Sequence, residues 1–121
     1  MQANQTLVHT FRMQNSEQKI AERKKLLAPE GATFGKLQVI EKLLTGSTGK
    51  FYISDDISLA DIVVFCAVCQ FQSGFIDGLD AGVVAQFPKM KELRDNVAAH
   101  PKVQEYYKGR EGEGIYKAYQ P

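Results

Sequence analysis

Apolar residues recur at intervals of three or four positions over most of the chain, and this spacing is typical of amphipathic α-helices. The stripes with this period are Phe34-Leu37-Ile40-Leu44, Met90-Leu93-Val97 and Val103-Tyr106-Tyr107. The run Phe51–Ile53 is the only strand-like tract, and it is too short to build a sheet. The pattern therefore predicts an all-α fold, a helical bundle of five to six helices with short connections.

Capping and breaking residues divide the first half of this pattern. Asn15 or Ser16 is expected to cap a helix that Pro29 ends, because proline disrupts a helix interior. A second helix is expected to run from about Thr33 to a stop at Gly46.

The second half contains further start signals. Asp80 is expected to cap a short helix that continues through Gln86, and Pro88 suits the first position of the next helix. The dipeptide His100-Pro101 separates that helix from a last one. We interpret His100 as a local capping or solvent-facing residue rather than a general base, because no carboxylate or nucleophile neighbours it in the sequence.

The most informative motif lies between these halves, where Ser58 is followed three positions later by Asp61. This is the spacing of a capping box, in which each side chain bonds the backbone amide of the other residue. Ile57 and Ile62 have the spacing of a hydrophobic staple. The following helix, from Leu59 to about Gln72, is apolar on nearly every side and is predicted to be buried all round. Asp61 could act as an acid or base in a cleft, but its spacing favours the structural capping role.

Charge excludes several classes of partner. The 121 residues form one domain, and 15 basic against 14 acidic residues leave a net charge of +1. A charge this small creates no field that would attract nucleic acid or an anionic membrane. Arg23, Lys24 and Lys25 share a predicted helix with Glu17 and Glu22, which favours a solvated face over a binding site.

No apolar stretch reaches the length of a membrane span, and residues 1–10 lack the charged and apolar regions of a signal peptide. We therefore expect a cytoplasmic location, with no membrane partner.

Two cysteines, Cys66 and Cys69, form a C-x-x-C motif two turns inside the apolar helix. Redox pairs of this spacing usually lie at an exposed helix start, and a zinc site needs two more ligands, whereas His9 and His100 are distant and isolated. We interpret both cysteines as small core thiols and expect no metal site.

The segment Phe51–Phe65 resembles the start of the central helix in the C-terminal domain of cytosolic glutathione transferases. The matching positions are Phe51, Asp55, Ser58, Ala60 and Asp61. Ser54 stands where the family usually has glycine. The other stretches that agree in order are Glu17–Glu30, Gly35–Leu44, Phe75–Gln86 and Phe87–Tyr107. The resemblance covers residues from about 16 to 108 and leans toward sigma-like members.

The resemblance implies that residues 1–121 are a transferase C-terminal-like helical domain without the N-terminal thioredoxin-like domain. Residues 1–13, which include the helix expected over Gln5–Met13, would be the remnant of a truncated first helix. Residues 109–121 would be a tail. The family's activating Tyr or Ser hydroxyl has no counterpart that we can assign. Glutathione is the family's co-substrate, and we expect this chain alone to bind no cofactor and to be inactive.

The resemblance also implies a hydrophobic electrophile-binding site. Its walls would be Val63, Cys66 and Ala67 on the central helix, and the tail with Tyr116 and Tyr119 would close over it. Because the helix is apolar all round, residues at these helix positions are more often core than ligand wall, and the tail could be an unordered end.

Three functions follow from these alternatives. The chain could be the electrophile-binding part of a glutathione transferase, a stand-alone interaction module as in translation-factor or tRNA-synthetase complexes, or an apolar-ligand carrier. The absent lobe should leave an apolar face uncovered, so the expected partner is a thioredoxin-like domain or a second copy of the chain in a homodimer.

Overall fold

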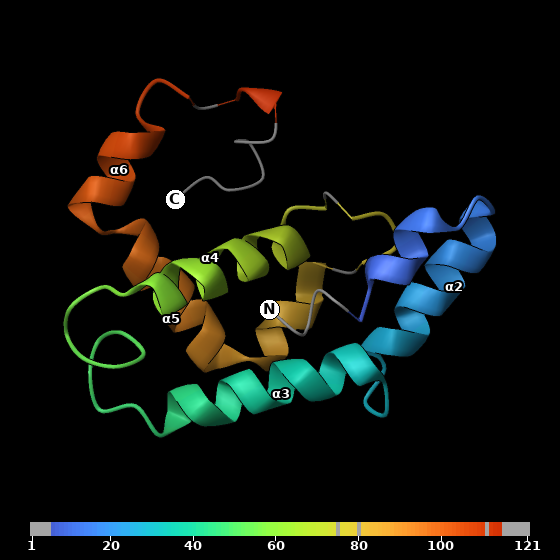
Figure 1. The fold of residues 1–121 in the computed structure, drawn as a ribbon, viewed down its shortest axis with the longest axis horizontal. Helices are drawn as coiled ribbons and strands as arrows, with labels where there is room; N and C mark the ends of the chain where they lie inside the picture. The colour runs from blue at the N-terminus through green and yellow to red at the C-terminus, as the bar shows by residue number, and fades with distance from the viewer. Residues whose placement is uncertain (1–5, 75, 80, 111, 115–121) are drawn as a thin grey trace.

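The computed structural model describes residues 6–74, 76–79, 81–110 and 112–114 (Figure 1). The elements in chain order are η1 (Val8–Arg12), α2 (Ser16–Leu27), α3 (Ala32–Thr45), α4 (Leu59–Gln72), η2 (Ala81–Gln86), α5 (Pro88–Ala98) and α6 (Pro101–Tyr107). The α elements are α-helices and the η elements are 3-10 helices, and the described residues contain no strand. The predicted all-α fold is confirmed.

The core lies where α4 packs on α5 and η2, with α3 against the other side of α5 and α2 against α3. In Figure 1, α4 crosses the picture above α3, and α5 lies between them. The largest of the fully buried apolar side chains are Leu7, Leu37, Val68, Phe71, Val84, Met90 and Val97. They come from most of the elements, so one core holds the bundle together.

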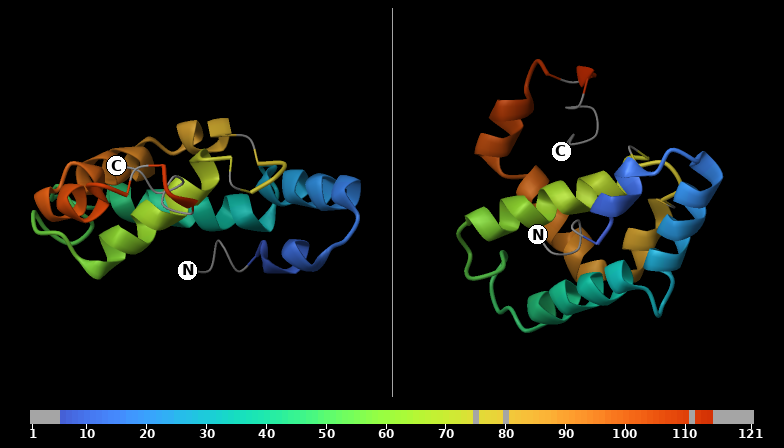
Figure 2. Two further views of the ribbon diagram at one scale, coloured as in Figure 1. Left: turned by 90° about the horizontal axis from the view of Figure 1, so that it is seen from above. Right: turned by 45° about the vertical axis from the view of Figure 1, so that its right-hand side comes forward.

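The predicted stripes differ in how far they are buried. In α5 the whole stripe is buried, which confirms that prediction. In α3, Phe34, Leu37 and Leu44 are buried and Ile40 is half-buried, so three of the four predicted positions are confirmed. The stripe of α6 is less buried, and its residues Val103 and Tyr107 pack against the core only as partly buried side chains. Tyr106 is 51% exposed, and no residue of α6 is buried. Figures 1 and 2 show the reason, because α6 leaves the end of α5 and stands away from the rest of the bundle.

The cap predictions agree with the structure. The Asn15 side chain accepts the N–H of Gln18 at 3.0 Å, and Gly46 is the C-cap of α3. The His100 ring caps α6 by accepting the N–H of Lys102 on Nδ1, at 3.3 Å. Asp80, which was expected to cap the segment now seen as η2, lies outside the described residues.

The N-terminal prediction was wrong in type, because the helix expected over Gln5–Met13 is the short 3-10 helix η1. Thr10 explains the difference. Its hydroxyl donates to the Leu7 carbonyl at 2.7 Å, and its N–H donates to the same carbonyl at 2.9 Å. Both bonds favour the tighter turn over an α-helix.

The solvated-face interpretation was wrong for Arg23, although Lys24 and Lys25 are exposed. Only 2% of Arg23 is accessible. Its Nε donates to Thr10 Oγ1 at 2.9 Å, its Nη1 donates to the Asp77 carbonyl at 2.7 Å, and its guanidinium lies 4.9 Å from the centre of the Phe11 ring. Arg23 therefore joins η1, α2 and the turn at residues 76–79.

The bounds predicted for the central helix match α4, but the prediction that it is buried all round was wrong. Leu59 is 76% exposed, and Ile62 and Val63 are about two-fifths exposed. These residues occupy the first half of α4, on the side that α5 and η2 do not cover. None of the described helices combines the length and apolar character needed to cross a bilayer.

Candidate functional site

The start of α4 is fixed by the buried carboxylate of Asp61. Ser58 donates both its N–H and its hydroxyl to Oδ2, each at 2.7 Å, and the capping box is formed. Tyr52 donates its N–H to Oδ1, also at 2.7 Å. Donors therefore occupy both oxygens of a side chain with no accessible surface, so the capping role is confirmed and Asp61 is not placed to act as an acid or base.

The connection before α4 is held by several bonds of its own. The N–H of Lys50 donates to Asp55 Oδ1 at 2.9 Å, and the N–H of Phe51 donates to the Ser54 carbonyl at 2.9 Å. Asn96 of α5 donates its side-chain amide to the Lys50 carbonyl at 3.0 Å. With Asp61, these bonds set the positions of Tyr52 and Ile57, and each of these residues lines a groove on one side of α4.

The first groove, which we call the α4–α6 groove, lies in the angle between these two helices and has a volume of about 440 Å³. Its lining residues are Ile57, Ile62, Phe65, Cys66, Val97, His100, Lys102, Val103, Tyr106 and Tyr107. The volume falls in the range of small-molecule sites, and most of the walls are apolar. The Phe65 and Tyr107 rings, from the two facing helices, have their centres 6.5 Å apart.

The second groove, the α3–α4 groove, lies on the opposite flank of α4 and also has a volume of about 440 Å³. Its lining residues are Ile40, Leu43, Tyr52, Leu59, Ala60, Val63 and Val64. This set contains no charged side chain and includes strongly exposed Leu43 and Leu59. The surface is more typical of a contact area than of a site for chemistry.

The residues expected to line one substrate site are not brought together. Val63 lines the α3–α4 groove, Cys66 lines the α4–α6 groove, and Ala67 is buried in the core. The core alternative is therefore confirmed for Ala67. Tyr116 and Tyr119 lie outside the described residues.

Sequence reasoning missed most of the α4–α6 groove, although two signals pointed to it. Ile57 and Ile62, identified as a staple, line this groove, and the apolar stripe of α6 forms another part of its wall. Both signals were interpreted as packing. The fold determines that α6 stands away from α4. The sequence of neither helix indicates this.

The two cysteines differ in surroundings. Burial raises the pKa of both thiols. For Cys69 burial is the largest cause, nearby Arg94 opposes it, and Cys66 adds a small further rise. Neither thiol is favoured as a thiolate, and within the described part of the chain no three His, Cys, Asp or Glu side chains gather as a metal site. Cys69 is a core thiol, as predicted, whereas Cys66 reaches the groove.

Comparison with known proteins agrees with this architecture. The family model described as "Glutathione S-transferase, C-terminal domain" matches residues 4–110. S-crystallin 4 of Enteroctopus dofleini is 32% identical over 73 residues, which are 59% of this chain and 32% of that protein. S-crystallin 2 of Octopus vulgaris is 29% identical over 76 residues, which are 61% of this chain and 33% of that protein.

The chain thus spans about a third of the length of the curated relatives it matches. No solved structure gave a significant match. The match over residues 4–110 confirms the resemblance inferred from the capping box and the later helices. The chain belongs to the family of glutathione S-transferase C-terminal domains.

Proposed function

We propose that this chain supplies the hydrophobic, electrophile-binding side of a glutathione transferase-like protein. The observation that carries the proposal is the α4–α6 groove, an apolar space of about 440 Å³ beside the central helix of a transferase C-terminal domain. Phe65 and Cys66 on α4 face Val103 and Tyr107 on α6 across it. Such walls suit an apolar electrophile, because contact with them removes its apolar surface from water.

The reaction proposed for the whole protein is addition of the glutathione thiolate to that electrophile. It needs a group that lowers the thiol pKa and a surface that holds the electrophile next to the thiolate. We assign the second task to this chain and the first to a thioredoxin-like domain outside it. Glutathione is then a co-substrate that this chain alone does not bind, and the chain alone is inactive.

Calorimetric titration and a turnover assay test this division. We expect chlorodinitrobenzene to bind to the isolated chain, with no heat from glutathione and no conjugation when both are present. Val103→Trp should fill the α4–α6 groove and abolish binding of the electrophile. Val63→Trp, on the α3–α4 groove, is the matched control and should leave binding unchanged.

Two outcomes would contradict the proposal. Turnover by the isolated chain would mean that an activating group is present in it. Equal loss of binding in both Trp variants, with unchanged thermal melts, would mean that the α4–α6 groove is not the binding site.

A second candidate function, an interaction module, is favoured by the α3–α4 groove. Leu43 and Leu59 on its rim are 53% and 76% exposed, and the described residues that line it include no charged side chain. We propose that this groove is covered by a thioredoxin-like domain, or by a second copy of the chain in a homodimer. Burial of these side chains would release water from both partners and so stabilise the complex.

Sedimentation velocity over a range of concentrations tests this candidate. Leu59→Lys should abolish self-association, because it places a charge inside the contact. Ile53→Lys replaces a side chain that is 71% exposed and outside the groove, and it should leave association unchanged. A monomer at every concentration would exclude the homodimer, and a thioredoxin-like domain would then be the partner to test.

A further inference from the structure

Cys66 and Cys69 are two neighbouring free thiols in the middle of α4. Residues three positions apart on a helix lie side by side, with Cβ atoms about 5–6 Å apart. Burial is the main cause of the raised pKa of Cys69, and the nearby Cys66 adds to it, so the two groups are close enough to interact. Metal–thiolate bonds of about 2.3 Å, the length found for zinc, would let one ion reach both sulfur atoms.

The α4–α6 groove gives an ion access to this pair. Cys66 is half-buried and lines the groove, whereas Cys69 is 3% exposed and has Arg94 of α5 beside it. The groove has a volume of about 440 Å³, which leaves room for a small ion next to Cys66. An ion that enters the groove therefore meets Cys66 first and then has Cys69 as its second ligand.

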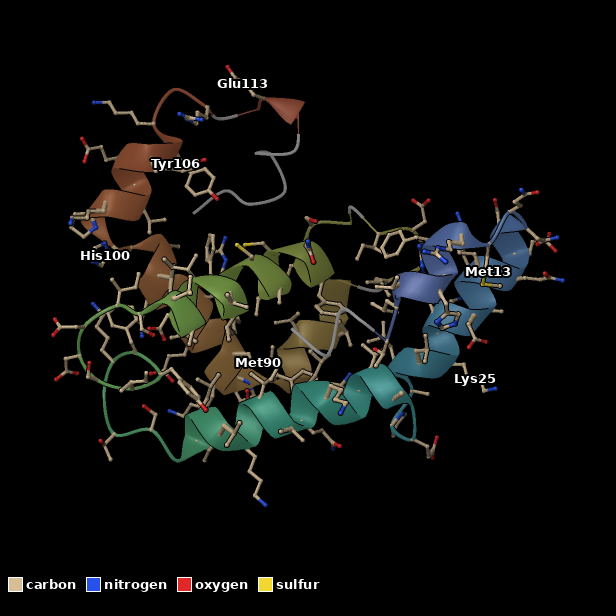
Figure 3. The ribbon with its side chains drawn as sticks, in the orientation of Figure 1. Met13, Lys25, Met90, His100, Tyr106 and Glu113 are labelled. Carbon is tan, nitrogen blue, oxygen red and sulfur yellow. The ribbon has the colours of Figure 1, made fainter. Side chains whose placement is uncertain are left out.

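The surroundings of the pair favour a soft ion. The described residues that line the groove include no carboxylate, and their only other side chain of a common ligand type is His100. In Figure 3, His100 lies where α5 passes into α6, on a different helix from the cysteines. Zinc sites need four ligands, and calcium and magnesium need oxygen ligands. Cu(I) prefers thiolates and is satisfied by two of them.

Arg94 supplies the charge that a copper site here requires. Two thiolates and one Cu(I) carry a net charge of −1, which is costly inside a protein unless a positive group lies close by. The charge and the hydrogen bond of Arg94 oppose the effect of burial on the pKa of Cys69, which places the guanidinium at this sulfur. The guanidinium also lies 5.8 Å from the centre of the Phe65 ring, one helical turn before Cys69. One arginine of α5 thus covers this face of α4.

We propose that Cys66 and Cys69 together bind one Cu(I) ion through both sulfur atoms. Each thiol releases its proton to solvent as its sulfur–copper bond forms, and the copper keeps its oxidation state. Arg94 is a positioning residue, which donates to Cys69 and balances the negative charge of the complex. The sequence led us to expect no metal site because the zinc pattern lacks two ligands, and Cu(I) does not need them. This site is independent of the proposed electrophile binding.

Anaerobic titration of the full, reduced chain with Cu(I), in competition with the chelator bicinchoninate, tests the site. We expect one Cu(I) per chain and weaker binding of Zn(II). Cys66→Ala and Cys69→Ala should each weaken Cu(I) binding by at least about a hundredfold, because each variant removes a second ligand held at high effective concentration. Native mass spectrometry gives the number of ions and of chains in the complex.

Two measurements on the unaltered chain keep the test valid if an alanine variant fails to fold. Bound Cu(I) should protect both Cys66 and Cys69 from iodoacetamide. It should also raise the melting temperature, because an ion that binds the folded chain stabilises it.

A further pair of variants tests the role of Arg94. Arg94→Gln should weaken Cu(I) binding about tenfold, as expected for a group that contacts a metal ligand. Lys89→Gln is the matched control, because Lys89 is an exposed cation on the same helix that pairs with Glu92, and it should leave binding unchanged. Equal effects of the two variants would overturn the role of Arg94.

Several outcomes would overturn the copper site. Full affinity in either alanine variant, or two ions per chain, would mean that the thiols act separately. One ion shared by two chains would place the site between copies of the protein. A lowered melting temperature would mean that the ion prefers the unfolded chain, and Zn(II) binding as tight as that of Cu(I) would contradict the preference for a soft ion. Absence of Cu(I) binding would exclude the site directly.

Discussion

Helices α5 and α6 follow one another in the chain and start in the same way, with proline in the first turn. Their surroundings nevertheless differ. In α5, Met90, Leu93 and Val97 are at least 97% buried between α3 and α4, whereas α6 has no buried residue. The local signals for a helix are thus equally strong in both segments. The depth of burial is decided by whether neighbours are present on the apolar side.

The same contrast appears at the helix starts. The first backbone N–H groups of α5 donate to a side chain on a distant helix. Lys89 and Met90 donate to the Glu41 carboxylate of α3 at 2.7 and 2.9 Å. The amide of Lys102 in α6 is bonded by the preceding His100. Helix α5 is therefore part of a network that spans the bundle, and α6 is held mainly by the chain next to it.

Removing an apolar side chain from each helix should give the largest difference between them. Leu93→Ala in α5 should lower the free energy of unfolding by about 3 kcal/mol, because it leaves a cavity in the core. Val103→Ala in α6 should cost less than about 1 kcal/mol, because the half-buried side chain lines an open groove. Urea denaturation measures both, and equal losses would show that α6 is as firmly packed as α5.

The second prediction concerns α4, which forms a wall for both helices. Asp61→Ala should lower the free energy of unfolding by about 2 kcal/mol, because the partly buried N–H groups of Tyr52 and Ser58 lose their acceptor. Asp95→Ala removes an exposed carboxylate and should cost less than about 0.5 kcal/mol. A thermal melt of Asp61→Ala that matched the wild type would contradict the anchoring role.

The third prediction compares the side chains that accept the first backbone N–H groups of α5 and α6. Glu41→Ala should cost about 1 kcal/mol, since two amides of α5 lose their acceptor. His100→Ala should cost about 0.3 kcal/mol, because its bond is longer and solvent can replace it. If chemical denaturation ranked the two variants in the opposite order, the view of α5 as the more strongly tied helix would be wrong.

The last prediction concerns the two thiols of α4. It is measured as a rate of chemical modification and not as a change in stability. Cys69 faces α5 and is buried, whereas Cys66 lines the groove beside α6, so iodoacetamide should modify Cys66 first. Burial raises both pKa values, so less thiolate is present at neutral pH and the rate should rise steeply as the pH increases from about 8 to 10. Peptide mapping of Cys66→Ser and Cys69→Ser identifies the modified residue. Faster modification of Cys69 would show that α5 opens more readily than α6.

Features that depend on short sequence spacing could be predicted from the chain alone. Ser58 and Asp61 are three residues apart, so helix geometry brings them together wherever the helix lies. The same is true of the Asn15 cap, the bounds of α4 and the apolar stripes of α3 and α5.

The remaining features depend on contacts between distant residues. The bonds from Lys89 and Met90 to Glu41 span 48 and 49 positions, and nothing near Glu41 in the sequence indicates them. Val63, Cys66 and Ala67 have the spacing of one helix face but meet different neighbours, so one predicted site became two grooves and a core position. The groove itself arises from the direction in which α6 leaves α5, which no local pattern specifies.

Arg23 bears on where this domain begins. The stretches that first indicated the family begin near residue 16, although the family match begins at residue 4. Every described α-helix lies after Asn15, so a domain cut at that point would keep all of these helices. Such a cut would remove the Thr10 hydroxyl and the Phe11 ring, and it would leave a guanidinium group inside the protein with one of its acceptors missing. The few residues ahead of α2 are therefore a structural requirement of the fold, and shortened versions of this protein should retain them.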